Sequence, residues 1–334
     1  MIITKPHKKI KYYLIAVLIF YSVPASSQSN IKVKNSPLFP NHPVRFITPF
    51  PPGASDVVAR IMGKKLGELT KQPFVIDNRS GAASTLGASI AAKANPDGYT
   101  ILFSTASFAI SAGYYKTLPY RSLEDFKGVG LIAKGPLMMA TNVSTNVLSA
   151  REFIQLAKSK PGSLNFGSAG AGSVSHLAVE RFKSLAGIQL LHVPYKGAMP
   201  ALTDLIGGQI QLIFAPLGIL LPLSKDGKIR ALGVPSDKRS TLAPDLPTIS
   251  ESGLPGFEAT TWYGVLAPIA TPKAIIESLN EYMSLALTSP DILSQFSNLG
   301  IEASPLTASS FDAYFRQEIV NWSKTIKEAH LTPD

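Results

Sequence analysis

Four stretches combine small, polar, Gly and Pro residues at points where an apolar run gives way to a helical pattern. They are PFPPGASD (49–56), STASFAIS (104–111), FGSAGAGSVSH (166–176) and FAPLG (214–218). Short side chains leave the backbone accessible, and the first N–H groups of a helix have no partner within that helix. Because such N–H groups attract carboxylates and phosphates, these stretches favour a site for a small anion.

The first stretch follows the apolar run VRFIT and contains three prolines before Gly53. Gly53, Ala54 and Ser55 have small side chains, Ser55 is of a type that caps helices, and Asp56 suits a first helical turn. One interpretation is an ordinary capped helix after a change of chain direction. The other is a corner that presents N–H groups to an anion. The stretch alone favours the first interpretation slightly and leaves both open.

The other stretches place hydroxyl groups and glycines in the same positions. Ser104, Thr105 and Ser107 follow the apolar run YTILF, and the third stretch has glycines, alanines and serines before a helical pattern. From Gly170 the third stretch reads G-x-G-x-x-S, so it lacks the last glycine of a dinucleotide-binding motif, and G-K-[ST] of a P-loop is absent. Glycines allow close approach of backbone to a ligand, and serines supply donors and acceptors.

The residues that enzymes use do not form a recognisable set. G-x-S-x-G is absent, and the chain has no cysteine, which excludes thiolate catalysis, disulfides and thiolate-bound metals. His176 and Glu180 lie four apart on a predicted helix, but two groups are too few for a metal site, so a capping or hydrogen-bonding role for His176 is favoured. His192 lies in an apolar strand and is interpreted as a core histidine. The sequence predicts no enzyme, no metal and no cofactor.

The elements that must position these loops alternate between strand and helix. Strands are predicted at 44–48, 74–78, 99–104, 164–168, 190–194, 210–215 and 229–234. Helices are predicted between them, and two or three more helices near 272–287, 290–298 and 309–328. This alternation is typical of parallel sheets covered by helices on both faces, where ligands bind beyond the carboxyl ends of the strands.

The length, composition and net charge of the chain limit the classes of protein to which it can belong. The chain has 334 residues, of which 45% are apolar and 16% charged, which favours two domains or lobes of an ordinary globular protein. The formal net charge is +10, and it falls to +6 without the four lysines of residues 1–27. No basic run or recognition motif accompanies this surplus, so nucleic acid is not an expected partner.

The first 27 residues have the pattern of a secretory signal peptide. Four lysines precede an apolar segment of about twelve residues, and Ala25, Ser26 and Ser27 follow it. An uncleaved anchor is the less favoured alternative, since a membrane span needs roughly 20 apolar residues. We expect cleavage near Ser27 and an exported, periplasmic protein.

Several longer blocks resemble one family. They include PVRFITPFPPGASDVVARIMGKKL, QPFVIDNRSGAASTLGASIAAKANPDGYTILF, KTLPYRSLEDFKGVG, the block from LAKSKPGSLNFGSAGAGSVSH to GGQIQLIF, the block from GKIRALGVPSDKRSTLAPDLPTI to TTWYGVLAP, and TPKAIIESLN. Together they make residues 38–334 similar to the periplasmic substrate-binding proteins of tripartite tricarboxylate transporters, the Bug family of extracytoplasmic solute receptors.

The resemblance implies an α/β, periplasmic-binding-protein-like fold of type II character, with a ligand cleft between two lobes. Each lobe would be a mainly parallel sheet flanked by helices. Lobe 1 would comprise residues 28–132 and 260–334, lobe 2 residues 133–259, with crossing strands near 129–133 and 259–266 and the C-terminal helices on lobe 1. The implied function is capture of a small carboxylate solute and delivery to the membrane subunits of a transporter, by a monomer. A receptor for a membrane sensor kinase is the main alternative, and a periplasmic enzyme a remote one.

The resemblance also implies ligand-binding residues. On one lobe they are Gly53, Ala54, Ser55, Asp56, Ser104, Thr105 and Ser107, and on the other Ser168, Ala169, Gly170, Ser173, His176 and Ala215. At Ala215 and Pro216 this chain departs from the Asp-Asn common in the family. NRSGAAS and GASD replace other runs of small residues, which leaves the backbone donors in place. We expect the distal end of the ligand to be less polar than usual.

Overall fold

The computed structural model describes residues 1–2, 39–50, 52, 54–81, 85–329 and 331. The chain divides into two units, Met1–Lys34 and Asn35–Asp334, and the helices and strands named below belong to the second unit. Most of the predicted signal peptide and Gly53 lie outside the described residues. No helix among the residues described is both long and apolar enough to cross a membrane.

The first sheet of the described chain has the strand order β11-β4-β10-β3-β1-β2. Its strands are β1 (Val44–Thr48), β2 (Phe74–Asn78), β3 (Thr100–Thr105), β4 (Phe126–Gly135), β10 (Thr261–Pro268) and β11 (Glu302–Ala303). β1 pairs in parallel with β2 and β3, whereas β10 is antiparallel to β3 and β4, and β11 is antiparallel to β4. The carboxyl ends of β1, β2 and β3 therefore lie at one edge of this sheet.

The second sheet has the order β7-β6-β8-β5-β9. Its strands are β5 (Leu137–Thr141), β6 (Asn165–Ser168), β7 (Leu191–Pro194), β8 (Leu212–Pro216) and β9 (Arg230–Gly233). β6 is parallel to β7 and β8, while β5 is antiparallel to β8 and β9. The carboxyl ends of β6, β7 and β8 thus form one edge, as the carboxyl ends of β1, β2 and β3 do in the first sheet.

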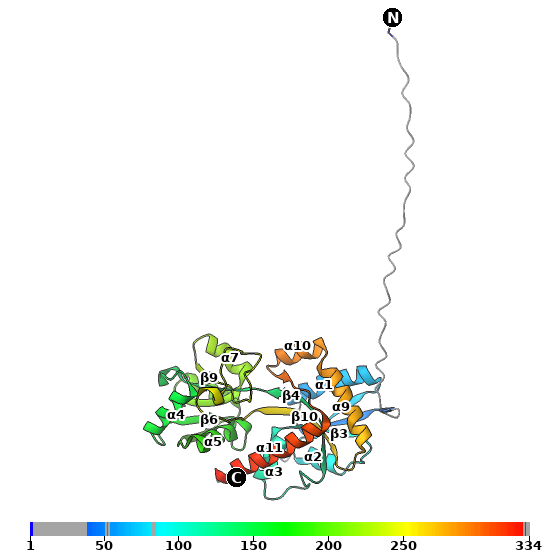
Figure 1. Cartoon of the computed structure of the whole chain (residues 1–334), viewed down its shortest axis with the longest axis horizontal. Coiled ribbons are helices and arrows are strands. Elements are labelled where there is room, and N and C mark those ends of the chain that lie inside the picture. The colour runs from blue at the N-terminus through cyan, green and yellow to red at the C-terminus, as the bar shows by residue number, and fades with distance from the viewer. Residues whose placement is uncertain (3–38, 51, 53, 82–84, 330, 332–334) are drawn as a thin grey trace. The chain divides into compact units, whose positions relative to one another are not determined.

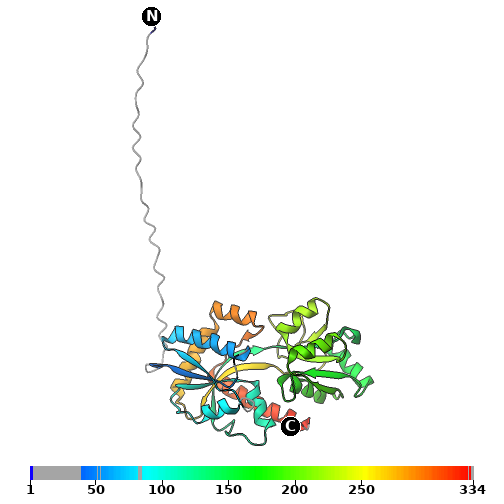
Figure 2. The ribbon, with the colours of Figure 1, turned by 180° about the vertical axis from the view of Figure 1, so that it is seen from behind.

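The predicted fold class is confirmed, and each sheet also contains antiparallel pairs beside its parallel ones. The chain leaves the first sheet at Gly135 and enters the second at Leu137, with only Pro136 between them. β10 likewise enters the first sheet on return from the second. The residues that link the sheets therefore add antiparallel strands to both (Figures 1 and 2).

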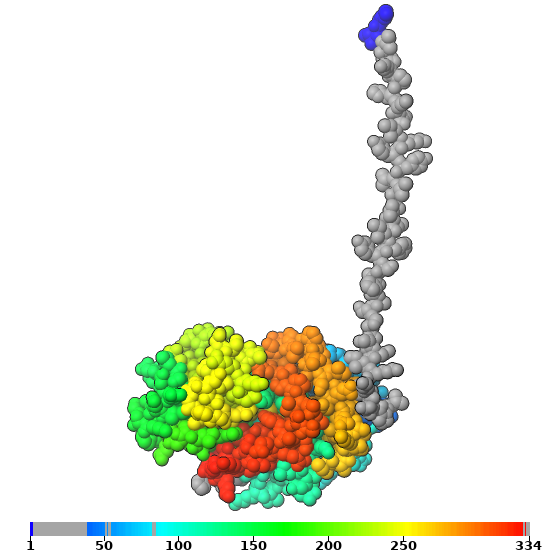
Figure 3. All heavy atoms as spheres, viewed as in Figure 1, coloured from blue at the N-terminus to red at the C-terminus, as the bar shows by residue number. Residues whose placement is uncertain are grey.

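The helices cover the sheets as the alternation predicts. They are α1 (Ala54–Thr70), α2 (Thr85–Ala92), α3 (Ala106–Tyr114), α4 (Ala150–Ser159), α5 (Val174–Ala186), α6 (Ala198–Ile206), α7 (Leu217–Lys225), α8 (Ile249–Ser252), α9 (Lys273–Leu287), α10 (Pro290–Asn298) and α11 (Ala308–Glu328), with a 3₁₀ turn at Val143–Thr145. α9 packs on α1 and β4, and α11 packs on α3, β4 and α5. Figure 3 shows α11 in red across the face turned to the viewer. The C-terminal helices therefore return to the first sheet, and α11 reaches the second as well.

Two helices lack the clear sequence pattern of an amphipathic helix. α3 (ASFAISAGY) is apolar on several faces because it lies between the first sheet and α11, so it lacks the polar stripe of an amphipathic helix. α7 contains Pro222, which usually argues against a helix. By contrast, α4 buries Ala150, Phe153, Ile154 and Ala157 at helical spacing and begins after the N-cap Ser149, so its sequence pattern is clear.

Candidate ligand-binding site

The parallel strands of the second sheet end beside a cavity of about 220 Å³. Its walls comprise Leu137, Ala169, Ser173, Val174, Ser175, Ala198, Ile213, Phe214, Ala215, Pro216 and Thr261. These residues come from the strand-to-helix loops after β6, β7 and β8 and from the strands that link the sheets. The cavity therefore occupies the position where open α/β sheets bind ligands.

Two helix N-termini meet at this cavity. Val174 and Ser175 begin α5 and Ala198 begins α6. The first N–H groups of a helix have no acceptor within the helix, and the helix dipole adds positive potential there. None of the cavity-lining residues is charged. An anion in this cavity would meet backbone dipoles and hydroxyl groups rather than an Arg or Lys side chain.

The loop between β6 and α5 is held in shape by its own serines. The Ser173 hydroxyl caps α5 by accepting from the His176 N–H at 3.2 Å, and it donates to the Gly170 carbonyl at 2.7 Å. The Ser175 hydroxyl accepts from the Ala169 N–H at 3.0 Å. Gly170 has φ +129° and Gly172 φ +72°, a region that L side chains rarely adopt. The glycines permit this compact loop, and the serines fix it before any ligand arrives.

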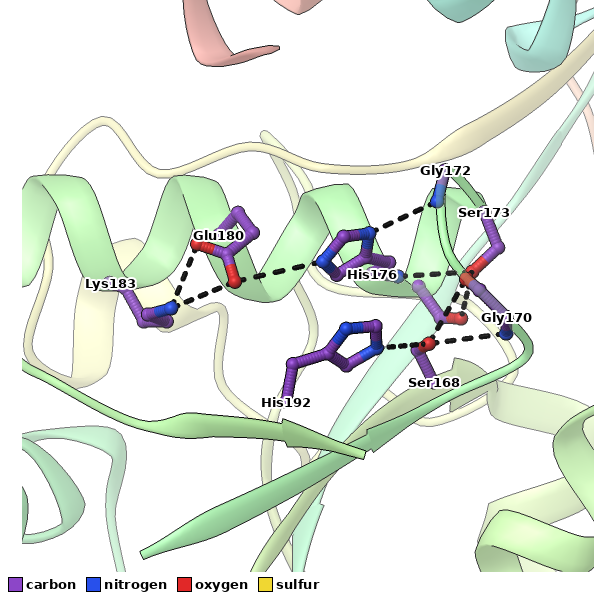
Figure 4. A network of polar contacts seen from close by, with 9 residues as sticks. Ser168, Gly170, Gly172, Ser173, His176, Glu180, Lys183 and His192 are labelled. Atoms are coloured by element: carbon purple, nitrogen blue, oxygen red, sulfur yellow. Dashed lines mark hydrogen bonds and ion pairs between the residues drawn. The ribbon is translucent and has the colours of Figure 1, made fainter. Parts of the chain in front are cut away.

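Two histidines lie behind this loop (Figure 4). The Gly172 N–H donates to His176 Nδ1 at 3.1 Å, and His192 Nε2 lies 2.7 Å from the Ser168 hydroxyl. Burial lowers the pKa of His176 to about 3 and that of His192 to about 4, with further contributions to the His176 shift from His192 and Lys183 and to the His192 shift from Lys183. Both imidazoles are therefore neutral at ordinary pH.

The first corner leads into α1, which begins at Ala54, so Ser55 lies inside the first turn and is not its N-cap. Asp56 is buried, and its carboxylate accepts from Arg60 Nε and from Asn78 Nδ2, each at 2.7 Å. Asn78 Nδ2 also donates to the Phe50 carbonyl at 2.9 Å. Asp56 thus joins α1, the end of β2 and the corner, and both of its oxygens are occupied by protein groups.

The second loop, after β3, lines a much smaller cavity of about 10 Å³. Ser104 is buried, and its hydroxyl has no hydrogen-bond partner within the described part of the chain. Thr105 caps α3 by accepting from the Ser107 N–H at 3.2 Å. The volume is near the minimum that holds one water molecule. Ser104 is therefore a buried donor at the carboxyl end of β3 that a water or ligand oxygen can reach only through this cavity.

The structure therefore divides the predicted residues between two hollows. Ala169, Ser173 and Ala215 line the larger cavity, whereas Ser104 and Thr105 line the small one. Ser168, Gly170 and His176 lie around the β6–α5 loop without lining the cavity. Gly53 and the Ala54 side chain lie outside the described part of the structure.

The prediction omitted Ser175, Ala198 and Thr261, which also line the cavity. Ser175 lies within the quoted glycine-rich stretch, and Ala198 begins a predicted helix, so both had a signal in the sequence. Thr261 had none, because its place depends on how β10 meets the second sheet.

A third hollow, of about 540 Å³, adjoins the 220 Å³ cavity and shares Pro216 and Thr261 with it. It lies between the start of α7 and the turn after α10, and its walls are mostly apolar, among them Leu217, Tyr263 and Leu299. Although it is larger, it contains none of the predicted site residues. We take the 220 Å³ cavity as the candidate site, because the loops that lead into the N-termini of α5 and α6 converge there.

The described residues contain no group of three or more His, Asp or Glu side chains placed to hold a metal ion. His176 and Glu180 do lie on one face, with Nε2 and Oε1 3.7 Å apart, but Lys183 occupies the Glu180 carboxylate at 2.8 and 2.9 Å. The structure therefore gives the His176–Glu180 pair a role within the protein.

The chain matches a family model and several known proteins over most of its length. A model of the tripartite tricarboxylate transporter family receptor matches residues 57–331. BugT of Bordetella pertussis is 34% identical over 293 residues, which cover 87% of this chain and 90% of BugT. Rpa4515 of R. palustris, solved with adipate, is 35% identical with a TM-score of 0.72, covering 89% of this chain and 100% of that one.

A further solved structure is also similar. MatC (Rpa3494) from Rhodopseudomonas palustris, solved with bound malate, is 30% identical with a TM-score of 0.68, covering 86% of this chain and 100% of that chain. BugD, solved as a periplasmic binding protein, has the same identity and TM-score. The chain therefore belongs to the tripartite tricarboxylate transporter receptor family, whose Bug members are periplasmic solute-binding proteins and not enzymes.

Proposed function

We propose that this protein captures a small organic solute bearing a carboxylate in the cavity beside α5 and α6, and delivers it to the membrane subunits of a tripartite tricarboxylate-type transporter. The observation behind this proposal is a cavity at the carboxyl ends of parallel strands where two helix N-termini meet without a charged side chain. The adipate and malate in two relatives at 30% identity or more support the same ligand class.

The carboxylate would accept hydrogen bonds from the first N–H groups of α5 and from the Ser175 hydroxyl. Preorganised donors of this kind bind an anion without an opposite charge, since the dipoles are fixed before the ligand arrives. The predicted residues of the first sheet, from Gly53 to Asp56 and from Ser104 to Ser107, would complete the site from the other side. The free Ser104 hydroxyl supports this part of the proposal.

The ligand would have an apolar distal end. Leu137, Ile213, Ala215 and Pro216 give the cavity apolar lining, and the adjoining hollow continues with mostly apolar side chains. A second carboxylate there would lose hydration without gaining a charged partner. A matched pair tests this: hexanoate should bind at least about tenfold more tightly than adipate, a difference near 1.4 kcal/mol. Equal or tighter binding of adipate would remove the apolar end from the proposal.

The protein would bind by approach of two lobes, residues 28–132 with 260–334 and residues 133–259. A polar contact between the two lobes supports this arrangement: the Glu302 carboxylate accepts from the Ser240 hydroxyl at 2.8 Å. Closure around a ligand is a common motion of two-lobed binding proteins.

Export would follow cleavage of the signal peptide near Ser27, and the periplasmic protein would act as a monomer. A role in uptake predicts slower growth of a deletion strain on the bound solute as sole carbon source. Unchanged growth and uptake would contradict delivery to a transporter while leaving solute binding intact.

A thermal-shift screen of the chain from Gln28 onward tests binding itself. The panel would contain mono-, di- and tricarboxylates and aromatic acids, each beside its neutral amide, and native mass spectrometry would detect a co-purified solute. We expect an acid to raise the melting temperature where its amide does not. Stabilisation by amides alone would contradict the proposal.

A further inference from the structure

Three aromatic rings stack behind the β6–α5 loop, and Figure 4 shows two of them, the imidazoles of His176 and His192. The His176 and His192 ring centroids are 3.9 Å apart with an interplanar angle of 9°, and the Phe166 ring lies 4.8 Å from that of His192 at 18°. His176 is buried and belongs to α5, whereas His192 belongs to β7 and Phe166 to β6. The stack therefore joins three elements directly beneath the loop.

Each histidine holds a different glycine of the loop. A backbone N–H can only donate, so the bond from Gly172 requires that His176 Nδ1 carry no proton. The His176 N–H is then at Nε2, facing the Glu180 carboxylate at 3.7 Å, and Lys183 fixes that carboxylate. This chain of contacts selects one tautomer of His176 and one ring orientation.

His192 acts on Gly170 through a serine. The Ser168 hydroxyl lies 2.7 Å from His192 Nε2, accepts from the Gly170 N–H at 3.1 Å and lies 3.1 Å from the Gly170 carbonyl. His192 thus determines how the Ser168 hydroxyl is oriented toward both backbone groups of Gly170. Neither histidine lines the cavity, whose walls on this side are Ala169, Ser173, Val174 and Ser175.

We propose that His176 and His192 are positioning residues, which as a stacked neutral pair hold the β6–α5 loop in the conformation that receives the ligand. The inference rests on the proposed function for the meaning of the loop, but its structural content is independent of any ligand. Burial favours the uncharged form of both rings, which agrees with the acceptor role of His176 Nδ1. Two positive charges 3.9 Å apart would also repel each other.

Hydrogen exchange of the ligand-free, full-length exported protein tests the proposal. His192→Phe keeps a ring for the stack and removes the bond to Ser168, and Ser168→Ala removes the same bond from the other side. We expect exchange of a peptide covering residues 168–176 to rise about tenfold in each variant, and not further in the double variant, because both delete one interaction. His192→Gln, which retains a hydrogen-bonding group, should restore much of the protection.

His42→Phe is the matched control, because the His42 ring also stacks on an aromatic ring, that of Tyr99, with 3.5 Å between the ring centroids. His42 lies just before β1 of the first sheet, whereas the β6–α5 loop belongs to the second sheet. His42→Phe should leave exchange of the 168–176 peptide unchanged. Unchanged exchange of that peptide in both His192→Phe and Ser168→Ala would overturn the proposal. So would an equal rise throughout β6, β7 and β8, which is the result of a general structural role.

Ligand affinity gives the second readout. If the wild-type protein binds a carboxylate, His192→Phe should weaken that binding about tenfold and His192→Gln much less. If the wild-type protein binds no carboxylate, the proposed function is contradicted. The positioning role is then tested by the hydrogen-exchange result alone.

Discussion

Asp56 illustrates how a residue in a predicted anion site can serve the site without touching the anion. A carboxylate would repel an anionic ligand, yet Arg60 and Asn78 both donate to it. Its burial and these two bonds make it a tie between α1 and the end of β2. The sequence predicted its position in the first helical turn, but its partners depend on folding, since Asn78 is 22 residues away.

Asp56→Ala should lower the free energy of unfolding by about 2 kcal/mol, because it removes the acceptor of one Asn78 Nδ2 hydrogen bond and of the Arg60 Nε hydrogen bond. Arg60→Ala should cost less than about 1 kcal/mol, since the arginine is half exposed. Urea unfolding of both variants measures the difference. Equal costs would show that the Asn78 bond contributes little.

The histidine pair predicts a loss of stability in mild acid. Each ring has a pKa well below the ordinary 6.5 when folded and near 6.5 when unfolded, so the unfolded chain binds more protons between about pH 6.5 and pH 4. The free energy of unfolding should therefore be constant above pH 7 and fall as the pH falls. At pH 5 the loss should be about 2 kcal/mol for buried His176 and less for the partly exposed His192.

Melting temperatures from pH 8 to pH 5 measure this effect, in a range where most carboxylates stay ionised. The groups that face the pair are Glu180 and Lys183. His192→Phe, which cannot be protonated, should show a shallower fall than the wild-type protein. A melting temperature that does not change with pH, or the same pH dependence of the melting temperature in both proteins, would contradict the neutral state of the two histidines.

At the scale of elements, the sequence predicted the strand-to-helix joints better than it predicted the pairing of strands. The glycine-rich stretch 166–176 indicated a loop, and Ser173 does cap the helix that follows. Ala169, Ser173 and Ala215 were predicted and line one cavity, because loops at the carboxyl ends of adjacent parallel strands must meet. The antiparallel β5 and β10 and the roles of Ser175 and Thr261 were not predictable locally, since they depend on contacts between distant segments.

Substitutions of two N-cap serines can distinguish an effect on stability from an effect on ligand binding. Ser173→Ala and Ser149→Ala each remove a cap, of α5 and α4, and each should cost about 1 kcal/mol of stability. Only Ser173 touches the cavity, so only Ser173→Ala should weaken binding of the carboxylate found by thermal shift, by roughly tenfold. Calorimetry on both variants checks this, and similar affinities in the two would contradict a site at the start of α5.

At the scale of the whole molecule, the second sheet is joined to the first by Pro136 and by the residues before β10. The helix α7 of the second sheet approaches the turn after α10 of the first, where Gly218 and Gly300 meet. A Cβ on Gly218 would lie 3.3 Å from the Gly300 Cα. This close contact adjoins the candidate cavity without lining it.

Gly218→Val should therefore separate the lobes slightly and lower ligand affinity without changing any cavity-lining residue. Small-angle scattering should show a larger radius of gyration for the variant and less contraction on addition of ligand. Gly207→Val is the control, because a Cβ there meets only ordinary contacts within its own helix turn. An unchanged radius and affinity in Gly218→Val would contradict closure at this contact.

The central claim is that helix N-termini at the cavity bind a carboxylate, and calorimetry of the best acid against its own amide tests it most directly. The pair has nearly the same shape and differs in charge at one end. The account predicts saturable one-to-one binding of the acid, and affinity at least about a hundredfold lower for the amide. Equal binding of acid and amide, or tighter binding of the amide, would contradict it.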